Sequence, residues 1–364
     1  MKISIITVCK NSEKTIEQTI QSVVRAQDGK LEYIIVDGGS SDGTLDIIKK
    51  YEKEIEIAIS EPDGGIYEAM NKGIALASGE VIGIINSDDW YEPETFDIVR
   101  RCFCETDAEV VCGKLNFVYP DGKREIMEPE NIEKLRYEMI VPHPTAFVKR
   151  EAYWKYGEFE TKFRIAADYE LMLRFYTKGA KFCNVDRVLA NFRVGGASRQ
   201  QKEKCAEETM SISKKYLFCT PLEERIHIKD IIARRYLTFW FEKLLEDSRD
   251  RFVRILNEKL GVGYHDEIVI FGAGKWGQKV CGILQKKMWI SYIVDNGKKK
   301  QGCCANGVRI LEPEILKSFK GILLLMVKDY SAEILSQVED LRNSTLYCIS
   351  WEEIAEEFVN EIRI

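Results

Sequence analysis

Two adjacent carboxylates, Asp88 and Asp89, closely follow the apolar run Val81–Ile85 in the stretch VIGIINSDDWYEP. A short apolar run rich in β-branched residues predicts a strand that is covered on both faces of a sheet. Adjacent carboxylates repel each other, so one of them needs a cation or a proton to be stable. Carboxylate and phosphate oxygens are the ligands that Mg²⁺ or Mn²⁺ prefers. The pair therefore suggests a divalent metal that holds a diphosphate.

Similar polar clusters end the earlier strand-like segments: TVCKN, VDGGSSDGT and SEPDGG. In a parallel α/β sheet the carboxyl ends of the strands lie along one edge, where ligands bind. The side chains that we expect to converge there are Thr7, Asp37, Asp63, Ser87, Asp88 and Asp89. Turn formation and helix capping explain Ser40, Ser41 and Asp42 equally simply, and we prefer that interpretation for these three.

The segments that would position these groups alternate between strand and helix patterns. Strand-like runs occupy residues 3–8, 32–37, 55–59 and 81–85. Between them, apolar residues recur at helical spacing, as in Ile16, Ile20 and Val23. This alternation predicts the α/β class, with a mostly parallel sheet flanked by helices.

The pattern changes twice further along the chain. A charge-rich, helical pattern runs to about Leu260, and strand-helix alternation resumes at His265. We therefore predict an α/β domain over residues 1–200, a helical connector over 201–264 and a small α/β domain over 265–364.

Composition limits the possible partners. The 364 residues carry a net charge of −6, without the basic excess that is typical of nucleic-acid binding, so we expect no nucleic acid. The N-terminal apolar run is too short for a signal peptide, and Gly321–Val327 is too short for a membrane span. The eleven cysteines show no zinc-binding spacing and are interpreted as free thiols of a cytoplasmic protein.

Five motifs occur in an order that resembles the family 2 glycosyltransferases of the GT-A fold, more narrowly the bacterial enzymes that build surface polysaccharides. They are SIITVCKN, EYIIVDGGSSDGT, SEPDGGIYEAMNKGIALASGEVIGIINSDDWY, HPTAFVKREAYWKYGEF and IAADYELMLRFYTKGAKF. The resemblance covers about residues 1–200. It implies a GT-A domain that binds a nucleotide diphosphate sugar.

The resemblance also implies roles for single residues. Thr7, Asp37 and Asp63 would contact the donor, with Asp37 facing the base or ribose. NSDD matches the family's D-x-D-type motif, which makes Asp89 the direct ligand of Mg²⁺ or Mn²⁺. Asp88 would contact the donor sugar or ribose, and Ser87 replaces the first acidic position.

AADYE matches the family's Glu-Asp motif, with Ala167 where Glu often stands and Asp168 as the candidate catalytic base. Inverting transfer needs a carboxylate that takes the proton of the attacking hydroxyl. The alternative for Asp168 is a carboxylate that interacts with a helix N-terminus. His143 and Trp90 are candidates for acceptor binding, and both are equally plausible as structural residues.

The C-terminal segment EIVIFGAGKWGQKV carries G-x-G-x-x-G at Gly272, Gly274 and Gly277, after a strand and at the start of a helix. Asp295 ends the next strand-like run, where a ribose-binding acid is expected. This segment resembles small Rossmann-like modules appended to sugar-modifying enzymes. Either it binds a nucleotide, or the glycines only permit a tight turn; we lean to the second.

The expected function is therefore inverting, metal-dependent transfer of a hexose or N-acetylhexosamine, with UDP as the expected nucleotide, to a hydroxyl of a lipid-linked oligosaccharide. The protein would act in the cytoplasm. Peripheral contact with the inner face of the cell membrane and formation of a homo-oligomer are both compatible with this expectation. The alternatives are a nucleotide-sugar oxidoreductase or epimerase centred on Gly272, and a non-catalytic GT-A scaffold. The connector, with its run YLTFWF, would touch lipid or, as we prefer, pack between domains.

Overall fold

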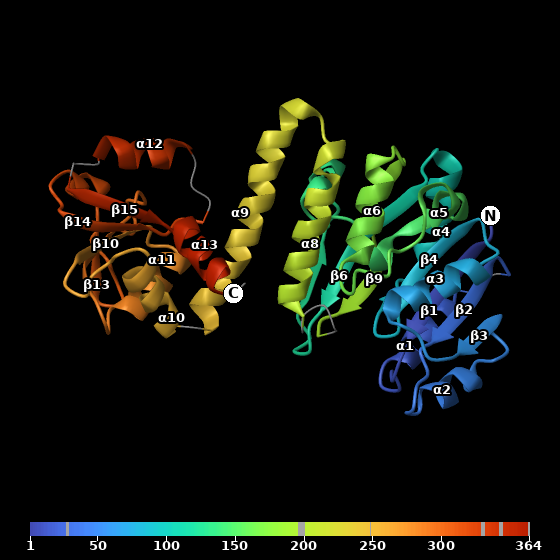
Figure 1. The fold of residues 1–364 in the computed structure, drawn as a ribbon. Helices are drawn as coiled ribbons and strands as arrows, with labels where there is room; N and C mark the ends of the chain where they lie inside the picture. The colour runs from blue at the N-terminus through green and yellow to red at the C-terminus, as the bar shows by residue number, and fades with distance from the viewer. Residues whose placement is uncertain (27–28, 196–200, 248, 329–331, 342–344, 363–364) are drawn as a thin grey trace. The chain divides into compact units, whose positions relative to one another are not determined.

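The structure is a computed structural model, and it describes residues 1–26, 29–195, 201–247, 249–328, 332–341 and 345–362. It divides into two compact units, residues 1–232 and 233–364, so the boundary falls within helix α9 (Leu222–Asp247). Each unit has its own sheet with helices on both sides (Figure 1).

The predicted alternation is confirmed in the first unit. Its first half consists of β1 (Ile3–Cys9), α1 (Ile16–Val24), β2 (Leu31–Asp37), α2 (Thr44–Lys50), β3 (Ile57–Ser60), α3 (Ile66–Leu76) and β4 (Val81–Asn86). Its second half consists of β5 (Trp90–Tyr91), α4 (Thr95–Glu105), β6 (Val110–Val118), β7 (Arg124–Met127), η1 (Ile132–Arg136), η2 (His143–Thr145), β8 (Phe147–Lys149), α5 (Arg150–Tyr156), α6 (Ala167–Thr177), β9 (Phe182–Arg193), α8 (Lys202–Tyr216) and η3 (Leu217–Cys219).

The sheet of the first unit is parallel only in part. Strands β3, β2, β1 and β4 run parallel, as predicted, whereas β8 pairs antiparallel with β4 and with β6. Alternate residues of the central strands face opposite cores: Ile6 and Ile34 pack towards α3 and α6, and Ile5 and Tyr33 pack towards α1 and α4. This three-layer packing holds the carboxyl ends of β1 and β4 rigidly beside each other.

The second unit contains a smaller sheet in the order β12-β13-β11-β10-β14-β15. After the second half of α9 it consists of α10 (Arg249–Arg254), η4 (Ile255–Lys259), β10 (Glu267–Phe271), α11 (Lys275–Leu284), β11 (Trp289–Val294), β12 (Cys304–Ala305), β13 (Val308–Leu311), η5 (Pro313–Lys317), β14 (Gly321–Leu325), α12 (Ala332–Leu341), β15 (Leu346–Ser350) and α13 (Trp351–Ile362). The five longer strands are parallel and follow the order of a doubly wound sheet.

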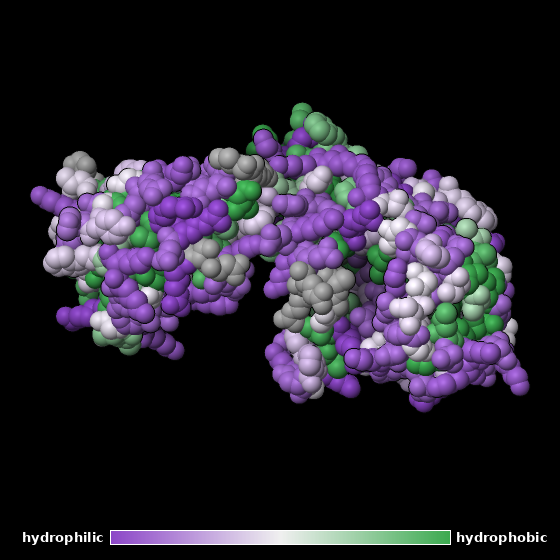
Figure 2. All heavy atoms as spheres, turned by 60° about the horizontal axis from the view of Figure 1, so that its bottom comes forward, coloured by the Kyte–Doolittle hydropathy of each residue, from purple (hydrophilic) through white to green (hydrophobic). Residues whose placement is uncertain are grey.

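Most of the surface seen in Figure 2 is hydrophilic. The aromatic run YLTFWF of α9 does not form an exposed apolar face, because Tyr236, Trp240 and Phe241 are buried. Among the described residues, no helix has the length and apolar character that crossing a membrane requires.

Candidate active site

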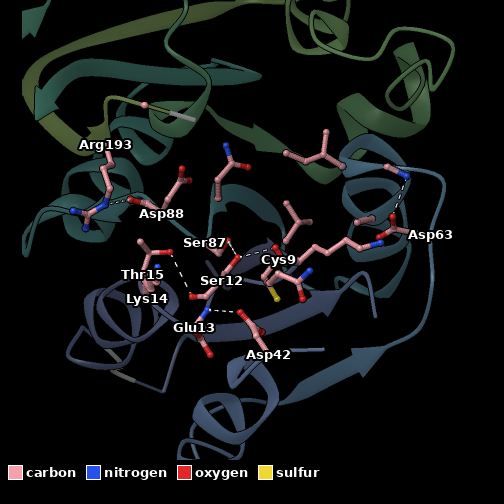
Figure 3. A pocket seen from close by; sticks show the side chains of 18 of the residues that line it. Cys9, Ser12, Glu13, Lys14, Thr15, Asp42, Asp63, Ser87, Asp88 and Arg193 are labelled. Atoms are coloured by element: carbon pink, nitrogen blue, oxygen red, sulfur yellow. Dashed lines mark hydrogen bonds between the residues drawn. The ribbon is translucent and has the colours of Figure 1, made fainter. Parts of the chain in front are cut away.

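A cleft of about 1080 Å³ opens at the carboxyl ends of β1 and β4 in the first unit. Most of its walls come from four segments that are distant in sequence: residues 8–15, 63–66, 86–88 and 192–195; Asp42 and Ala69 complete the lining. Figure 3 shows Asp88 beside Arg193, with Asp63 on the other side of the pocket. The sheet thus brings together three of the six residues that were expected to converge, namely Asp63, Ser87 and Asp88.

Asp88 is half-buried and lines this cleft. Burial raises the pKa of its carboxyl group, while the charge of Arg193 opposes the rise. Two residues earlier, Asn86 also lines the cleft, and its Oδ1 is buried and accepts no hydrogen bond from the part of the chain that the structure describes. The Ser87 hydroxyl lies 2.8 Å from the Ser12 hydroxyl at the cleft wall. Asn86 and Asp88 therefore offer two oxygen ligands for a cation.

Asp89, the predicted metal ligand, is not among the residues that line the cleft. Its side chain has no exposed surface, and its Oδ1 accepts a 3.0 Å hydrogen bond from the backbone N–H of Arg193. Burial, with the charge of Asp88, raises the pKa of Asp89 well above its ordinary value. Oδ2 of Asp89, like Oδ1 of Asn86, is buried and has no hydrogen-bond partner among the described residues. Asp88 is the acid of the pair that lines the cleft.

Thr7 and Asp37, two predicted donor contacts, also lie outside the cleft. Thr7 is fully buried, with its hydroxyl 3.1 Å from that of Tyr33. Asp37 is 1% exposed and accepts hydrogen bonds from the hydroxyl groups of Ser40 (2.5 Å) and Ser60 (2.6 Å). Burial opposes the ionisation of Asp37, but these hydrogen bonds prevail and lower its pKa. Asp37 therefore shapes the loop after β2 from within.

Asp63 and Asp42 do line the cleft. The Asp63 carboxylate accepts a hydrogen bond of 2.9 Å from the N–H of Gly65 and lies against Gly38, where a Cβ would be 2.7 Å from its Oδ2. Asp42 accepts a hydrogen bond of 3.0 Å from the N–H of Thr44, which agrees with the expected turn-forming role. Its place in the cleft, however, was not expected.

Sequence reasoning missed the cations that line the cleft; among the described residues these are Lys10, Lys14 and Arg193. The Arg193 guanidinium lies 5.2 Å from the centroid of the Trp90 ring and donates hydrogen bonds to the Asp88 carbonyl (3.3 Å) and to Gln18 Oε1 (2.7 Å). Trp90, the predicted acceptor contact, is among the lining residues of neither cleft, and its ring packs against Arg193. Basic residues around a carboxylate suit a diphosphate with a cation.

A second cleft, of about 240 Å³, adjoins the first and shares Ile66, Asn86 and Phe192 with it. Asp168 and His143 both line it, together with many apolar side chains. The apolar set includes Met70, Leu115, Phe117, Met127, Met139 and Val141.

Asp168 stands at the start of α6, as predicted, and is held by two neighbours. Its Oδ1 accepts the N–H of Tyr169 at 2.9 Å and lies 3.3 Å from the Tyr67 hydroxyl. Burial and the charge of Asp168 raise the pKa of Tyr67 well above its usual value, so this hydroxyl keeps its proton. Burial lowers the pKa of His143 although Asp168 opposes it, so the imidazole is neutral at pH 7. A carboxylate and a neutral imidazole thus face one small cleft.

The glycine motif of the second unit forms the predicted strand-to-helix turn. Gly272 has φ +106°, and a Cβ on Gly277 would lie 1.7 Å from the Gly272 carbonyl oxygen. Gly274 directly precedes α11, where a Cβ would meet nothing within 4 Å. Asp295 accepts hydrogen bonds from the N–H groups of Ala273 (2.7 Å) and Gly297 (2.8 Å), so both of its oxygens have protein partners. These contacts explain Asp295 by the local structure of the turn.

Comparison with known proteins agrees with this geometry. Residues 4–165 match the family model of glycosyl transferase family 2, and residues 264–345 match the model C2185-like, N-terminal. An uncharacterized glycosyltransferase of Mycobacterium tuberculosis is 32% identical over 185 residues, which are 47% of this chain and 68% of that protein.

Two solved structures share the fold. TarS 1-349 of S. aureus has a TM-score of 0.56 at 19% identity, over 72% of this chain and 79% of that one. The mannosyltransferase PcManGT of Pyrobaculum calidifontis, in complex with GDP-Man and Mn²⁺, has a TM-score of 0.52 at 17% identity. The match covers 65% of this chain and 71% of that one. TarS 1-349 was also solved in complex with UDP-GlcNAc. The chain belongs to the family 2 glycosyltransferases and has their GT-A fold.

Proposed function

We propose that the protein is an inverting, metal-dependent transferase of a hexose or N-acetylhexosamine, with a UDP-sugar as donor. The proposed acceptor is a hydroxyl of a lipid-linked oligosaccharide, in surface polysaccharide synthesis at the cytoplasmic face of the membrane. The observation that carries the proposal is that the larger cleft, lined by Asp88 and several cations, adjoins a smaller cleft that is lined by Asp168. Solved relatives in complex with UDP-GlcNAc and with GDP-Man and Mn²⁺ support a nucleotide-sugar donor.

Asn86 and Asp88 are the residues that would hold Mg²⁺ or Mn²⁺. Mg²⁺ commonly takes one or two protein oxygens and completes its shell with water and substrate phosphates. The buried Oδ1 of Asn86, with no partner among the described residues, and the half-buried Asp88 carboxylate fit that shell. When bound, the cation would stabilise the charge that develops on the diphosphate as it leaves. Lys10, Lys14 and Arg193 would bind the phosphates beside it.

Asp168 is the proposed general base. It would accept the proton of an acceptor hydroxyl while that oxygen bonds to the anomeric carbon, and the bond from this carbon to the diphosphate would break with both electrons going to the diphosphate. One displacement inverts the anomeric configuration. Tyr67 keeps the Asp168 carboxylate oriented, and the neutral His143 is placed to orient the hydroxyl.

The smaller cleft supports an acceptor with an apolar group near its hydroxyl. Three methionines and two phenylalanines are among the side chains that line it, namely Met70, Met127, Met139, Phe117 and Phe192. A free hydrophilic sugar would leave these side chains without an apolar partner, whereas a lipid-linked saccharide provides one.

Titration calorimetry of UDP, GDP and dTDP, each with Mn²⁺ and with a chelator, tests the donor assignment. We expect UDP to bind in the presence of Mn²⁺, and to bind at least ~10-fold more weakly to Asp88→Asn. Equal binding of UDP with metal and with chelator would contradict the metal-dependent proposal. Tight binding of GDP or dTDP alone would correct the nucleotide.

A further inference from the structure

One carboxylate on helix α8 accepts hydrogen bonds from three consecutive backbone N–H groups. Glu208 binds the N–H of Arg164 at 2.9 Å, that of Ile165 at 2.9 Å and that of Ala166 at 3.0 Å. These residues directly precede α6, whose second residue is Asp168. Ala166 is the N-cap of α6, and N–H groups at the start of a helix have no partner within the helix and need an acceptor from elsewhere. Glu208 supplies it from a different element of the fold.

The segment that Glu208 holds touches both clefts. Its Ile165 carbonyl accepts a 2.6 Å hydrogen bond from the Tyr67 hydroxyl, which also lies 3.3 Å from Asp168. Its Arg164 guanidinium donates a 2.6 Å hydrogen bond to the carbonyl of Gly64, a residue of the larger cleft. Movement of residues 164–166 would therefore move the candidate base relative to the donor.

Helix α8 is itself fixed to α6 independently of Glu208. The Ser213 and Tyr169 hydroxyl groups lie 2.8 Å apart, and Lys215 donates a 3.0 Å hydrogen bond to the fully buried Glu170. Tyr216 also donates to Glu170. Because these contacts lie further along α8, removal of the Glu208 carboxylate leaves the helix docked and frees only the segment 164–166.

We propose that Glu208 is a positioning residue that sets the place of Asp168, an inference that rests on the proposed role of Asp168 as base. Residues 164–166 directly precede α6 and thereby fix where the Asp168 carboxylate lies in the smaller cleft. Their three charge-assisted hydrogen bonds to Glu208 restrict their movement. Glu208 itself lines neither cleft and acts through Arg164 and Ile165, which line the smaller one. Helix α8 lies beyond residues 4–165, which match the family model.

Four variants of the full chain separate positioning from stability. Glu208→Ala removes the acceptor oxygens, and Glu208→Gln retains one of them without the charge. Glu207→Ala is the matched control, because Glu207 is an exposed carboxylate on the same helix. Tyr216→Phe removes a contact between α8 and α6 far from residues 164–166. For each variant, kcat and KM of sugar transfer, metal-dependent UDP binding and the melting temperature are measured.

We expect kcat of Glu208→Ala to fall ~10- to 100-fold, because a small displacement of a catalytic group is costly. UDP affinity and donor KM should stay within ~2-fold of wild type, and Glu208→Gln should recover much of kcat. Glu207→Ala and Tyr216→Phe should keep kcat even if Tyr216→Phe melts earlier. Unchanged kcat in Glu208→Ala, or a loss equal to that of Tyr216→Phe, would overturn the inference. If the wild type binds no nucleotide and transfers no sugar, the proposed function fails instead.

Discussion

The Arg193 backbone N–H donates a hydrogen bond of 3.0 Å to Oδ1 of Asp89, and thereby ties the end of β9 to the turn after β4. The adjacent carboxylate of Asp88 lines the cleft. Two neighbouring acids of one motif therefore lie in different surroundings, since Asp89 holds the backbone of β9 and Asp88 faces the cleft.

Substitution of the two acids should separate these tasks. Asp88→Asn should weaken metal-dependent UDP binding at least ~10-fold and leave the melting temperature nearly unchanged. Asp89→Asn should keep UDP binding within ~3-fold, because its amide oxygen still accepts the Arg193 N–H. Asp89→Ala should cost about 1–3 kcal/mol of unfolding free energy, since that N–H loses its partner. Calorimetry and urea unfolding measure both effects, and a larger loss of binding in Asp89→Asn than in Asp88→Asn would restore Asp89 as the ligand.

Arg193 should contribute to donor binding through its guanidinium. Arg193→Ala should raise the donor KM ~10-fold, because a charged contact to phosphate is lost. Trp90→Leu should raise it only ~3-fold, since it removes the aromatic face that supports Arg193. Lys123→Ala removes a comparable exposed cation over Tyr119 and serves as the control. If Arg193→Ala leaves KM unchanged in steady-state kinetics, the phosphates bind elsewhere.

Much of the first unit could be predicted because buried parallel strands are continuous apolar runs. Val81–Ile85 and Ile3–Val8 carry such runs, and their polar ends mark the cleft. The second half of the sheet escaped prediction because β9 has mixed polarity and is only partly buried. Periodicity does not extend into the turn after Asn86, so the orientation of Asp88 and Asp89 could not be derived from it. Arg193 and Glu208 are remote in sequence from their partners, and no local pattern links them.

The buried carboxylate of Glu32 should make the stability of the first unit depend on pH. Burial opposes its ionisation, but hydrogen bonds from Lys2 (2.7 Å), Ser4 (2.5 Å) and Ser78 (2.7 Å) prevail and lower its pKa from 4.5 to about 2. A pKa that is lower in the folded state stabilises the fold above the unfolded pKa. This stabilisation is lost as the pH falls from 4.5 towards about 2.

Glu32→Gln should therefore reduce the unfolding free energy by about 2 kcal/mol at pH 7 and by much less near pH 2. Urea unfolding at several pH values measures the difference from wild type. Glu52→Gln, at an exposed position, is the control and should show no such dependence. A difference that stays constant over the whole pH range would contradict the assignment.

The apolar lining of the smaller cleft predicts a preference among acceptors. Octyl or phenyl glycosides should be better acceptors than the methyl glycoside of the same sugar, because each buried CH₂ contributes about 0.8 kcal/mol. Met139→Gln should reduce this preference ~4-fold, whereas Ile126→Gln, at a position 57% exposed, should not. Competition between paired acceptors in one reaction gives the ratio directly. Equal use of octyl and methyl glycosides would contradict an apolar acceptor site without affecting the donor assignment.

The central claim is that Asp88 and Asp168 serve metal-dependent sugar transfer from adjoining clefts. The most direct measurement is nucleoside diphosphate release from UDP-sugars with an octyl glycoside acceptor, with Mn²⁺ and with chelator. Wild type, Asp88→Asn and Asp168→Asn are compared. We predict that nucleoside diphosphate release by the wild type needs metal. Release should fall at least ~100-fold in Asp168→Asn, which should still bind UDP. In Asp88→Asn, both release and UDP binding should be lost. Release that persists in Asp168→Asn, or that proceeds equally well with chelator, would contradict the account.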